Sequence, residues 1–169
     1  MILVALGSNI ESRWGSPSRT IKKALRLLDK KGCRVIKCSS LFETAPLGRT
    51  DQPDFVNAVV QVDSELAPES MLALLHDIEA EAGRRRGETW GPRALDLDLL
   101  DVHGLIRAAP PPVLPHPGME ERPFVLAPIE EIAPEWRHPI NGRSAGEMLA
   151  LLSGRQEGAV LRKLGEAEG

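Results

Sequence analysis

The sequence predicts one mixed α/β domain in which two β-α-β units follow one another along the chain. Short apolar runs alternate with two segments of helical periodicity, and glycine or proline separates most of these segments. The 169 residues fit one domain, and a chain of this length buries enough surface to form a core without metal or disulfide cross-links. We therefore expect a single domain over residues 1–169, with a ferredoxin-like βαββαβ sandwich and a C-terminal extension of helix and strand.

The first β-α-β unit begins with an apolar run at residues 2–6, which is typical of a buried strand. Ser16 is a favourable N-cap and Pro17 suits the first helical position, so a helix is expected to begin there. Gly32 is a natural residue to end that helix. Residues 34–42 then return to strand character and complete the unit.

The second unit follows a loop at residues 44–54 that is rich in proline and glycine. Residues 55–62 are largely β-branched and are expected to form a central strand. Pro68 opens a second amphipathic helix, and Gly83 ends it. Residues 94–102 form the next strand, so the strand and helix order of a split βαβ sandwich is complete.

The C-terminal part contains weaker signals. Residues 109–117 are a proline-rich loop that is too extended for a helix. A short helix is expected after Pro123, and Pro128 is expected to prevent it from continuing. A capping-box pattern at residues 144–147 predicts another helix, and residues 159–164 predict an edge strand.

The composition argues against a nucleic-acid-binding protein and against a small disulfide-stabilised protein. The formal net charge is −3 and the pI is about 5.8, whereas a nucleic-acid binder usually carries a basic surplus. Cys33 and Cys38 are too few for a disulfide scaffold, and free thiols suit a reducing compartment. No signal peptide or transmembrane span stands out, so we expect a cytoplasmic protein without membrane contact.

The clearest chemical signal is a pair of aspartates on the strand at residues 94–102. Asp96 and Asp98 project from the same face of a strand, with α-carbons about 6.6 Å apart. The leucines that alternate with them project into the core. Two converging carboxylates suit a magnesium ion, which prefers a few carboxylates together with phosphates and water. The alternative is an amphipathic strand with an acidic outer face, although aspartate is depleted in strands and like charges repel.

Arginines lie close to this strand and suit phosphate binding. Arg84, Arg85 and Arg86 follow the second helix, and Arg93 immediately precedes the aspartate strand. Arginine stays charged and offers planar, bidentate donors to phosphate oxygens, and the chain has no phosphate loop with a catalytic lysine. Alternatively, the three consecutive arginines complement the C-terminal dipole of a helix, which is the reading we favour for Arg85.

A different kind of pocket is predicted around residues 44–57. Asn57 lies within an apolar strand, where an unpaired amide is costly, so it either recognises a ligand or is satisfied structurally. Phe55 and Phe124 adjoin polar loops and could stack on a flat heteroaromatic ring or belong to the core. His116 and Arg122 follow the aspartate strand and could contact phosphate oxygens.

These segments together resemble the 6-hydroxymethyl-7,8-dihydropterin pyrophosphokinase family. The most specific stretch is Trp90-Gly91-Pro92-Arg93-Ala94-Leu95-Asp96-Leu97-Asp98. The other matching stretches are residues 5–9, 43–48, 55–59 and 115–124. The resemblance runs to about residue 134, and the remaining residues contain nothing diagnostic. Pro117 and Gly118 depart from the pattern expected of the family.

The resemblance implies transfer of pyrophosphate from ATP, as co-substrate, to the hydroxymethyl oxygen of the pterin, with release of AMP, in folate biosynthesis. Asp96 and Asp98 would ligate two magnesium ions, and together with Arg84 and Arg93 they are the expected catalytic residues. The residues expected to bind the nucleotide are Glu79, Arg86, Arg93, His116 and Arg122. Those expected to bind the pterin are Thr44, Pro46, Leu47, Phe55, Asn57, Trp90 and Phe124.

Two other functions fit parts of the sequence. An ordinary kinase that moves only the γ-phosphoryl group to a small heteroaromatic alcohol needs the same magnesium and arginines. A ferredoxin-like nucleic-acid-binding module would stack bases on sheet aromatics, but this chain has 4% aromatic residues and no tyrosine. We therefore expect small-molecule substrates, no nucleic acid or membrane partner, and a monomer.

Overall fold

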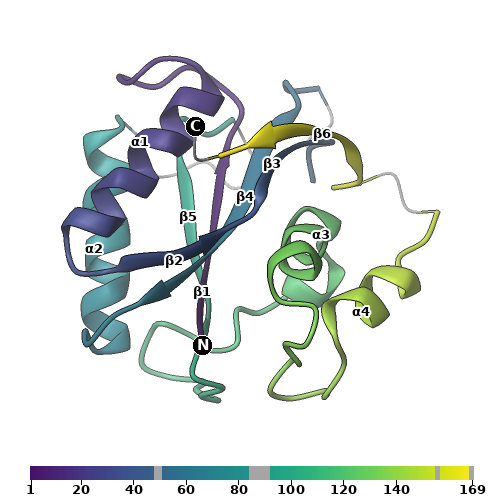
Figure 1. The fold of residues 1–169 in the computed structure, drawn as a ribbon. Helices are drawn as coiled ribbons and strands as arrows, with labels where there is room; N and C mark the ends of the chain where they lie inside the picture. The colour runs from purple at the N-terminus through teal and green to yellow at the C-terminus, as the bar shows by residue number, and fades with distance from the viewer. Residues whose placement is uncertain (48–50, 84–91, 155–156, 168–169) are drawn as a thin grey trace.

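The computed structural model describes residues 1–47, 51–83, 92–154 and 157–167. Within these residues six strands form one sheet, with two helices on each face (Figure 1). The strands are β1 (Ile2–Ser8), β2 (Arg34–Cys38), β3 (Ser40–Thr44), β4 (Phe55–Asp63), β5 (Asp96–Val102) and β6 (Val160–Glu166). The helices are α1 (Pro17–Lys30), α2 (Pro68–Glu81), α3 (Pro123–Ile132) and α4 (Ala145–Leu151), with a 3-10 turn at Met119–Glu121.

The strand order confirms the predicted fold class. The sheet runs β5-β1-β4-β3-β6, and β2 also pairs with β4. Within the described residues, neighbouring strands of the sheet pair antiparallel. Because β2 and β3 occupy the place of one strand beside β4, the first five strands have the arrangement of a ferredoxin-like βαββαβ sandwich. Strand β6 adds an outer strand beside β3, as expected of the C-terminal extension.

The expectation of one strand over residues 34–42 was wrong, because Ser39 interrupts the strand and separates β2 from β3. The backbone N–H of Ser39 donates to the carbonyl of Val59, and the Ser39 hydroxyl accepts from the N–H of Val59, both at 2.9 Å. The serine side chain therefore replaces a backbone group in the ladder. The pairing of β2 with β4 also shifts register between Val35 and Lys37, which marks a local irregularity before the break.

The helix ends follow the capping residues in the sequence. Ser16 precedes α1, and its hydroxyl accepts from the N–H of Arg19. Ser144 and Glu147 form both hydrogen bonds of a capping box at the start of α4. Both helix starts were therefore predictable from local sequence alone.

The expectation that Pro128 would end the helix after Pro123 was wrong, since α3 continues to Ile132. A proline inside a helix removes one hydrogen bond, here to the carbonyl four residues earlier. The helix buries Leu126, Ile129 and Ile132 on both sides of this position, together with the proline itself. Burial of this apolar face offsets the missing hydrogen bond.

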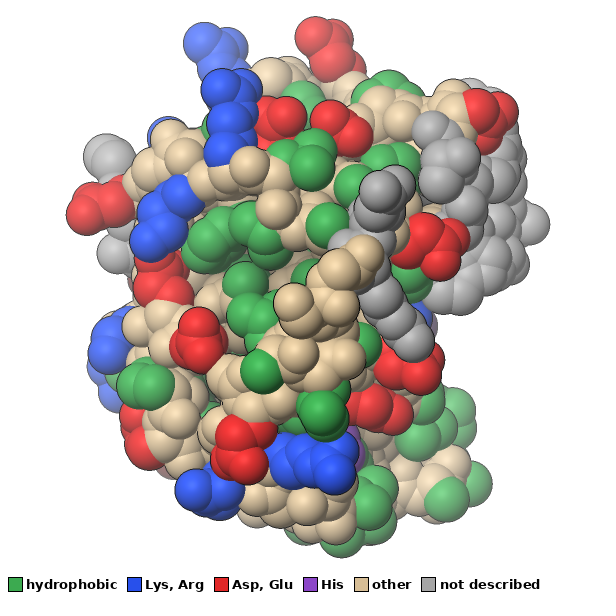
Figure 2. Space-filling model, turned by 90° about the vertical axis from the view of Figure 1, so that its right-hand side faces the viewer, with side chains coloured by type: hydrophobic (Ala, Val, Ile, Leu, Met, Phe, Trp, Pro, Cys, Tyr) green, Lys and Arg blue, Asp and Glu red, His purple; other side chains and the backbone are tan. Residues whose placement is uncertain are grey.

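Two apolar cores lie on opposite faces of the sheet. Helices α1 and α2 cover one face, and α3 and α4 cover the other (Figure 1). Leu95, Leu97 and Leu99 are buried in the first core, as the alternation of the sequence predicted. Beyond the second core, the outer surface of α3, α4 and β6 carries a shallow hollow of about 580 Å³ in which apolar side chains gather (Figure 2).

Both cysteines are free thiols, as predicted. Cys33 is buried, and this burial raises the pKa of its thiol despite a hydrogen bond with Ser64. Among the described residues, no helix has the length and apolar character needed to span a membrane.

Candidate active site

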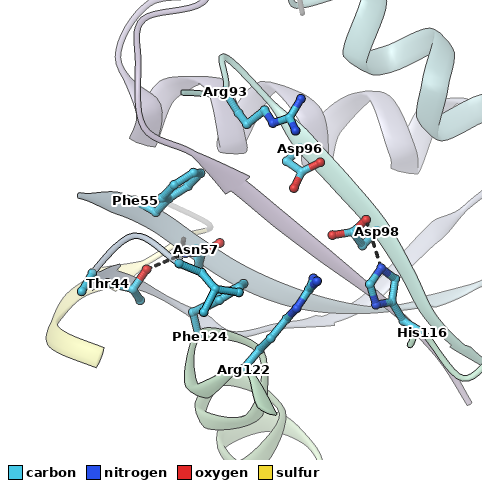
Figure 3. Close-up of a pocket in the computed structure, with 11 residues that line it drawn as sticks. Thr44, Phe55, Asn57, Arg93, Asp96, Asp98, His116, Arg122 and Phe124 are labelled. Atoms are coloured by element: carbon cyan, nitrogen blue, oxygen red, sulfur yellow. Dashed lines mark hydrogen bonds and ion pairs between the residues drawn. The ribbon is translucent and has the colours of Figure 1, made fainter. Parts of the chain in front are cut away.

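One cavity of about 250 Å³ opens above the sheet where β1, β3, β4 and β5 meet. Figure 3 shows side chains that point inward from β3, β4 and β5, from the start of α3 and from the loop after β5. The lining residues are Thr44, Ala45, Leu47, Phe55, Asn57, Arg93, Asp96, Asp98, His116, Arg122 and Phe124. Every one of them except Ala45 is a residue that the sequence predicted for the site.

The charged end of the cavity is built on β5. Asp96 and Asp98 are two positions apart in the strand and both are half-buried, while Leu97 between them is buried on the opposite face. Their carboxylates point toward the cavity (Figure 3). Nε2 of His116 lies 3.5 Å from Oδ1 of Asp98. The two carboxylates thus have access to a ligand while their backbone is held in the sheet.

Glu79 supports this end from the other side. It is 2% exposed, and its Oε2 accepts from the backbone N–H of Leu97 at 2.8 Å. Strand β5 pairs only with β1 among the described strands, so its outer N–H groups need other partners. Glu79 does not line the 250 Å³ cavity, but it lines a second one of about 370 Å³ that also includes Asp96, Asp98 and His116. The hydrogen bond from Leu97 therefore lets Glu79 hold β5 at the position between the two aspartates.

The uncharged end of the cavity is centred on Asn57. This side chain is 7% exposed, and its Nδ2 donates to Oγ1 of Thr44 at 2.6 Å. Phe55 lies on the same strand, and Phe124 reaches the cavity from α3 (Figure 3). The guanidinium of Arg122 lies 6.0 Å from the centre of the Phe124 ring, within the range of a cation–π contact. An amide and two aromatic rings therefore face one space.

Gly7 joins the two ends, and reasoning from the individual residues had assigned it no role. In the sheet it pairs with Asp96 on one side and with Asn57 on the other. A Cβ atom at this position would lie 2.5 Å from Oδ1 of Asn57 and 3.7 Å from the Phe55 ring. Any side chain here would displace the amide, so the cavity requires glycine. Only the pairing of β1 with both neighbours reveals this requirement.

Asn9 is a second residue that the reasoning from individual residues missed. Its Oδ1 accepts from the backbone N–H of Arg93 at 2.7 Å, and its Nδ2 donates to Gln52 and to the carbonyl of Pro53 at 2.8 and 2.9 Å. Its own N–H donates to the carbonyl of Arg93 at 3.0 Å. Asn9 therefore ties the chain before β4 to the chain before β5.

Besides Glu79, four predicted residues either do not line the cavity or lie outside the described part of the chain. Pro46 is buried and does not face the cavity, although Ala45 and Leu47 on either side of it do. Arg84, Arg86 and Trp90 lie outside the described residues, as does Arg85.

The residues present fit magnesium. Asp96 and Asp98 offer two carboxylates side by side at the edge of a cavity, which suits an ion that takes its remaining ligands from phosphate and water. The described part of the chain contains no group of three or more histidine, cysteine or acidic residues that would enclose a metal. A partly open metal site that a polyphosphate completes is therefore consistent with these donors.

Comparison with known families gives a match to the 7,8-dihydro-6-hydroxymethylpterin-pyrophosphokinase (HPPK) model over residues 3–134. The chain is 41% identical over 150 residues to the 2-amino-4-hydroxy-6-hydroxymethyldihydropteridine pyrophosphokinase of Pseudomonas aeruginosa, covering 88% of this chain and 90% of that protein. It is 42% identical over 130 residues to the enzyme of the same name from Bacillus subtilis, covering 76% and 75%.

Some relatives are much longer than this chain. The mitochondrial folate synthesis bifunctional protein of Pisum sativum is 37% identical over 154 residues, and the match covers 86% of this chain but 29% of that protein. The crystal structure of wild-type Plasmodium falciparum HPPK-DHPS superposes with a TM-score of 0.69 at 15% identity. That match covers 89% of this chain and 44% of the other, and it supports the fold.

Proposed function

The chain belongs to the 7,8-dihydro-6-hydroxymethylpterin-pyrophosphokinase family, and from this membership we propose that it transfers pyrophosphate from ATP to 6-hydroxymethyl-7,8-dihydropterin in folate synthesis. The observation that best supports this reaction is a single cavity with two chemically different ends. Carboxylates and cationic side chains line one end, and an amide with two aromatic rings lines the other. A polyphosphate and a flat heteroaromatic alcohol would therefore meet in one space.

The uncharged end suits the pterin. A flat ring gains most from stacking against aromatic faces, and Phe55 and Phe124 reach the cavity from different elements. The polar edge of the ring needs paired donors and acceptors, which Asn57 and the backbone at Thr44 and Leu47 would supply. Because Asn57 is already oriented by its hydrogen bond to Thr44, its remaining amide groups need little reordering on binding.

The charged end suits the triphosphate. Asp96 and Asp98 would hold magnesium, for which we propose two ions, and the bound metal would neutralise charge on the phosphate oxygens. Arg93, Arg122 and His116 line the same space and would contact the remaining oxygens. Arg84 and Arg86 would add to this set, and Trp90 would cover the pterin. Glu79 would act by holding the backbone of Leu97.

The transfer itself needs the two substrates aligned. The hydroxymethyl oxygen of the pterin would form a bond to the β-phosphorus of ATP as the bond from that phosphorus to the α-β bridging oxygen breaks. AMP leaves with the bridging oxygen, and the proton of the hydroxyl group is released to solvent. Such transfers depend mainly on positioning and on neutralising charge. Arg93 suits that task because its backbone is anchored on both sides by Asn9, which restricts where the guanidinium can reach. Action as a monomer in the cytoplasm stays a prediction.

The test is product analysis after the protein is mixed with Mg-ATP and 6-hydroxymethyl-7,8-dihydropterin. We expect AMP to appear one-for-one with a pyrophosphorylated pterin. ADP with a monophosphorylated product would overturn the reaction type and favour the γ-phosphoryl kinase. No pterin-dependent turnover from folded protein would overturn the acceptor.

A further inference from the structure

The C-terminal segment at residues 157–166 contacts residues that line the substrate cavity, although the family match ends at residue 134. Strand β6 lies beside β3 (Figure 1), and the pairing extends to Thr44 opposite Val160. One residue further on, the backbone N–H of Ala45 donates to the carbonyl of Ala159 at 2.9 Å. The segment thus holds the stretch of chain that lines the uncharged end of the cavity.

Gly158, which precedes Ala159 in the chain, packs against Phe124 on a different wall of the cavity. It is buried and has a φ of +69°, in the left-handed region that favours glycine. A Cβ atom here would lie 3.1 and 3.2 Å from Cδ2 and Cε2 of Phe124. Carbon atoms normally pack at about 3.5–4.0 Å, so the Phe124 ring already rests against the Gly158 backbone with no room for a methyl group.

We propose that Gly158 is a positioning residue for the acceptor, because its bare backbone sets how far the Phe124 ring stands back from the cavity. This inference rests on the proposed function, in which Phe124 stacks on the pterin. A methyl group at position 158 requires the ring to shift by a few tenths of an ångström. Because Phe124 also lines the cavity, a shift away from Gly158 would narrow the space that we propose for the pterin. The three atoms nearest to a Cβ at Gly158 belong to Phe124 and Pro123, and none belongs to a residue of the charged end, so we expect the main effect on the acceptor.

Two adjacent residues therefore support two walls of one pocket. Ala159 holds Ala45, which precedes Leu47 on one wall, and Gly158 backs the Phe124 ring on the other. The ion pair of Arg162 with Glu43, at 2.9 Å, adds a side-chain contact to the pairing of β6 with β3. The segment at residues 157–166, which lies outside the family match, thereby contributes to the shape of the acceptor site.

The experiment compares Gly158→Ala with Gly154→Ala. Gly154 belongs to the same part of the chain and has a φ of +90°, but nothing lies within 4 Å of a Cβ placed there. Both variants therefore carry the backbone cost of a left-handed alanine, and only Gly158→Ala meets an aromatic ring. We expect Gly158→Ala to raise the KM for the pterin about fivefold to tenfold, with the KM for ATP within about twofold of wild type. Gly154→Ala should leave both KM values within about twofold.

A double-mutant cycle with Phe124→Leu tests whether the effect passes through the ring. Because leucine leaves space beside Gly158, adding Gly158→Ala to Phe124→Leu should change the pterin KM by less than about twofold. An equal effect in both backgrounds, an equal effect of Gly154→Ala, or an unchanged pterin KM in Gly158→Ala would each overturn the proposal. If Gly158→Ala does not fold, Gly158→Asn and Gly154→Asn replace the pair, since asparagine tolerates the left-handed region better.

Measurements on the wild-type protein distinguish a failure of this proposal from a failure of the proposed function. If wild type binds and converts the pterin while Gly158→Ala behaves as Gly154→Ala does, only the role of Gly158 fails. If calorimetry detects no pterin binding to wild type with Mg-ATP present, the proposed acceptor fails and the inference fails with it.

Discussion

The charged and uncharged ends of the cavity differ in how the chain builds them. Asp96 and Asp98 come from one short stretch, and Arg93 lies three residues before the first of them, while His116 and Arg122 join this core of the charged end from the chain after β5. The uncharged end takes Thr44 from β3, Asn57 from β4 and Phe124 from α3. A site made from neighbouring residues has its geometry set by strand periodicity, whereas a site made from distant elements depends on the whole fold.

The two ends also differ in their exposure to solvent. Both aspartates are half-buried and keep access to the cavity, whereas Asn57 and Thr44 are buried and hydrogen-bonded to each other. The first arrangement leaves ligand positions open, and the second orients an amide in advance. Variants at the two ends should therefore fail in different ways, one in turnover and the other in acceptor binding.

The largest effect is expected from removing charge at the first end. Asp96→Asn and Asp98→Asn preserve side-chain size but remove a carboxylate that would hold magnesium. A metal ion stabilises the transition state by several kcal/mol, so we expect kcat to fall by about 100-fold or more in each variant. The rate of AMP formation at saturating substrates measures the effect.

Asp63→Asn is the matched control for these variants. Asp63 ends β4 and forms an exposed ion pair with Arg34 at 3.2 Å, away from the cavity. Exposed pairs of this kind contribute little, so its kcat should stay within about twofold of wild type. If Asp96→Asn and Asp98→Asn both kept nearly full turnover, neither carboxylate would belong to a metal site.

A smaller effect is expected at the uncharged end. Asn57→Ala removes the amide and leaves the Thr44 hydroxyl without its donor. The loss of a buried hydrogen bond to a ligand costs about 1–3 kcal/mol, so the KM for the pterin should rise about tenfold. The KM for ATP should remain within about twofold, and steady-state kinetics with each substrate varied in turn measures this difference.

Gln61→Ala provides the comparison on the same strand, since Gln61 is half-buried on β4 outside the cavity. It should change neither KM by more than about twofold. Equal changes in both KM values for Asn57→Ala would mean that Asn57 supports the sheet and does not distinguish the two ends.

The smallest effect is expected at Asn9, whose hydrogen bonds connect the chain before β4 with the chain before β5. Asn9→Ala removes the side-chain hydrogen bonds to Arg93, Gln52 and Pro53, and Asn9 does not line the cavity. Each such bond contributes about 0.5–1.5 kcal/mol, and the resulting loosening should raise both KM values about threefold. Asn141→Ala is the control, because Asn141 also accepts from a backbone N–H, that of Arg143, but lies outside the cavity. A rise in only one KM for Asn9→Ala would show that Asn9 serves one end alone.

Much of the charged end was predictable because its signal is local. The spacing of Asp96 and Asp98 placed both on one face, and the structure confirms that face as the cavity side. Asn57 was recognisable as an unusual residue in an apolar strand, but its partner Thr44 is thirteen positions away. The break at Ser39 and the continuation of α3 through Pro128 were not predictable, because in both places tertiary packing outweighs a local preference.

The sequence by itself determined which residue types lie on which face of each strand and where most helices begin. Those properties depend on periodicity and capping within a few residues. Only the tertiary structure decided that Gly7 must lack a side chain, that Asn9 joins two distant segments, and that Gly158 backs the Phe124 ring. Each of these depends on contact between atoms far apart along the chain, and local sequence does not encode the distance between them.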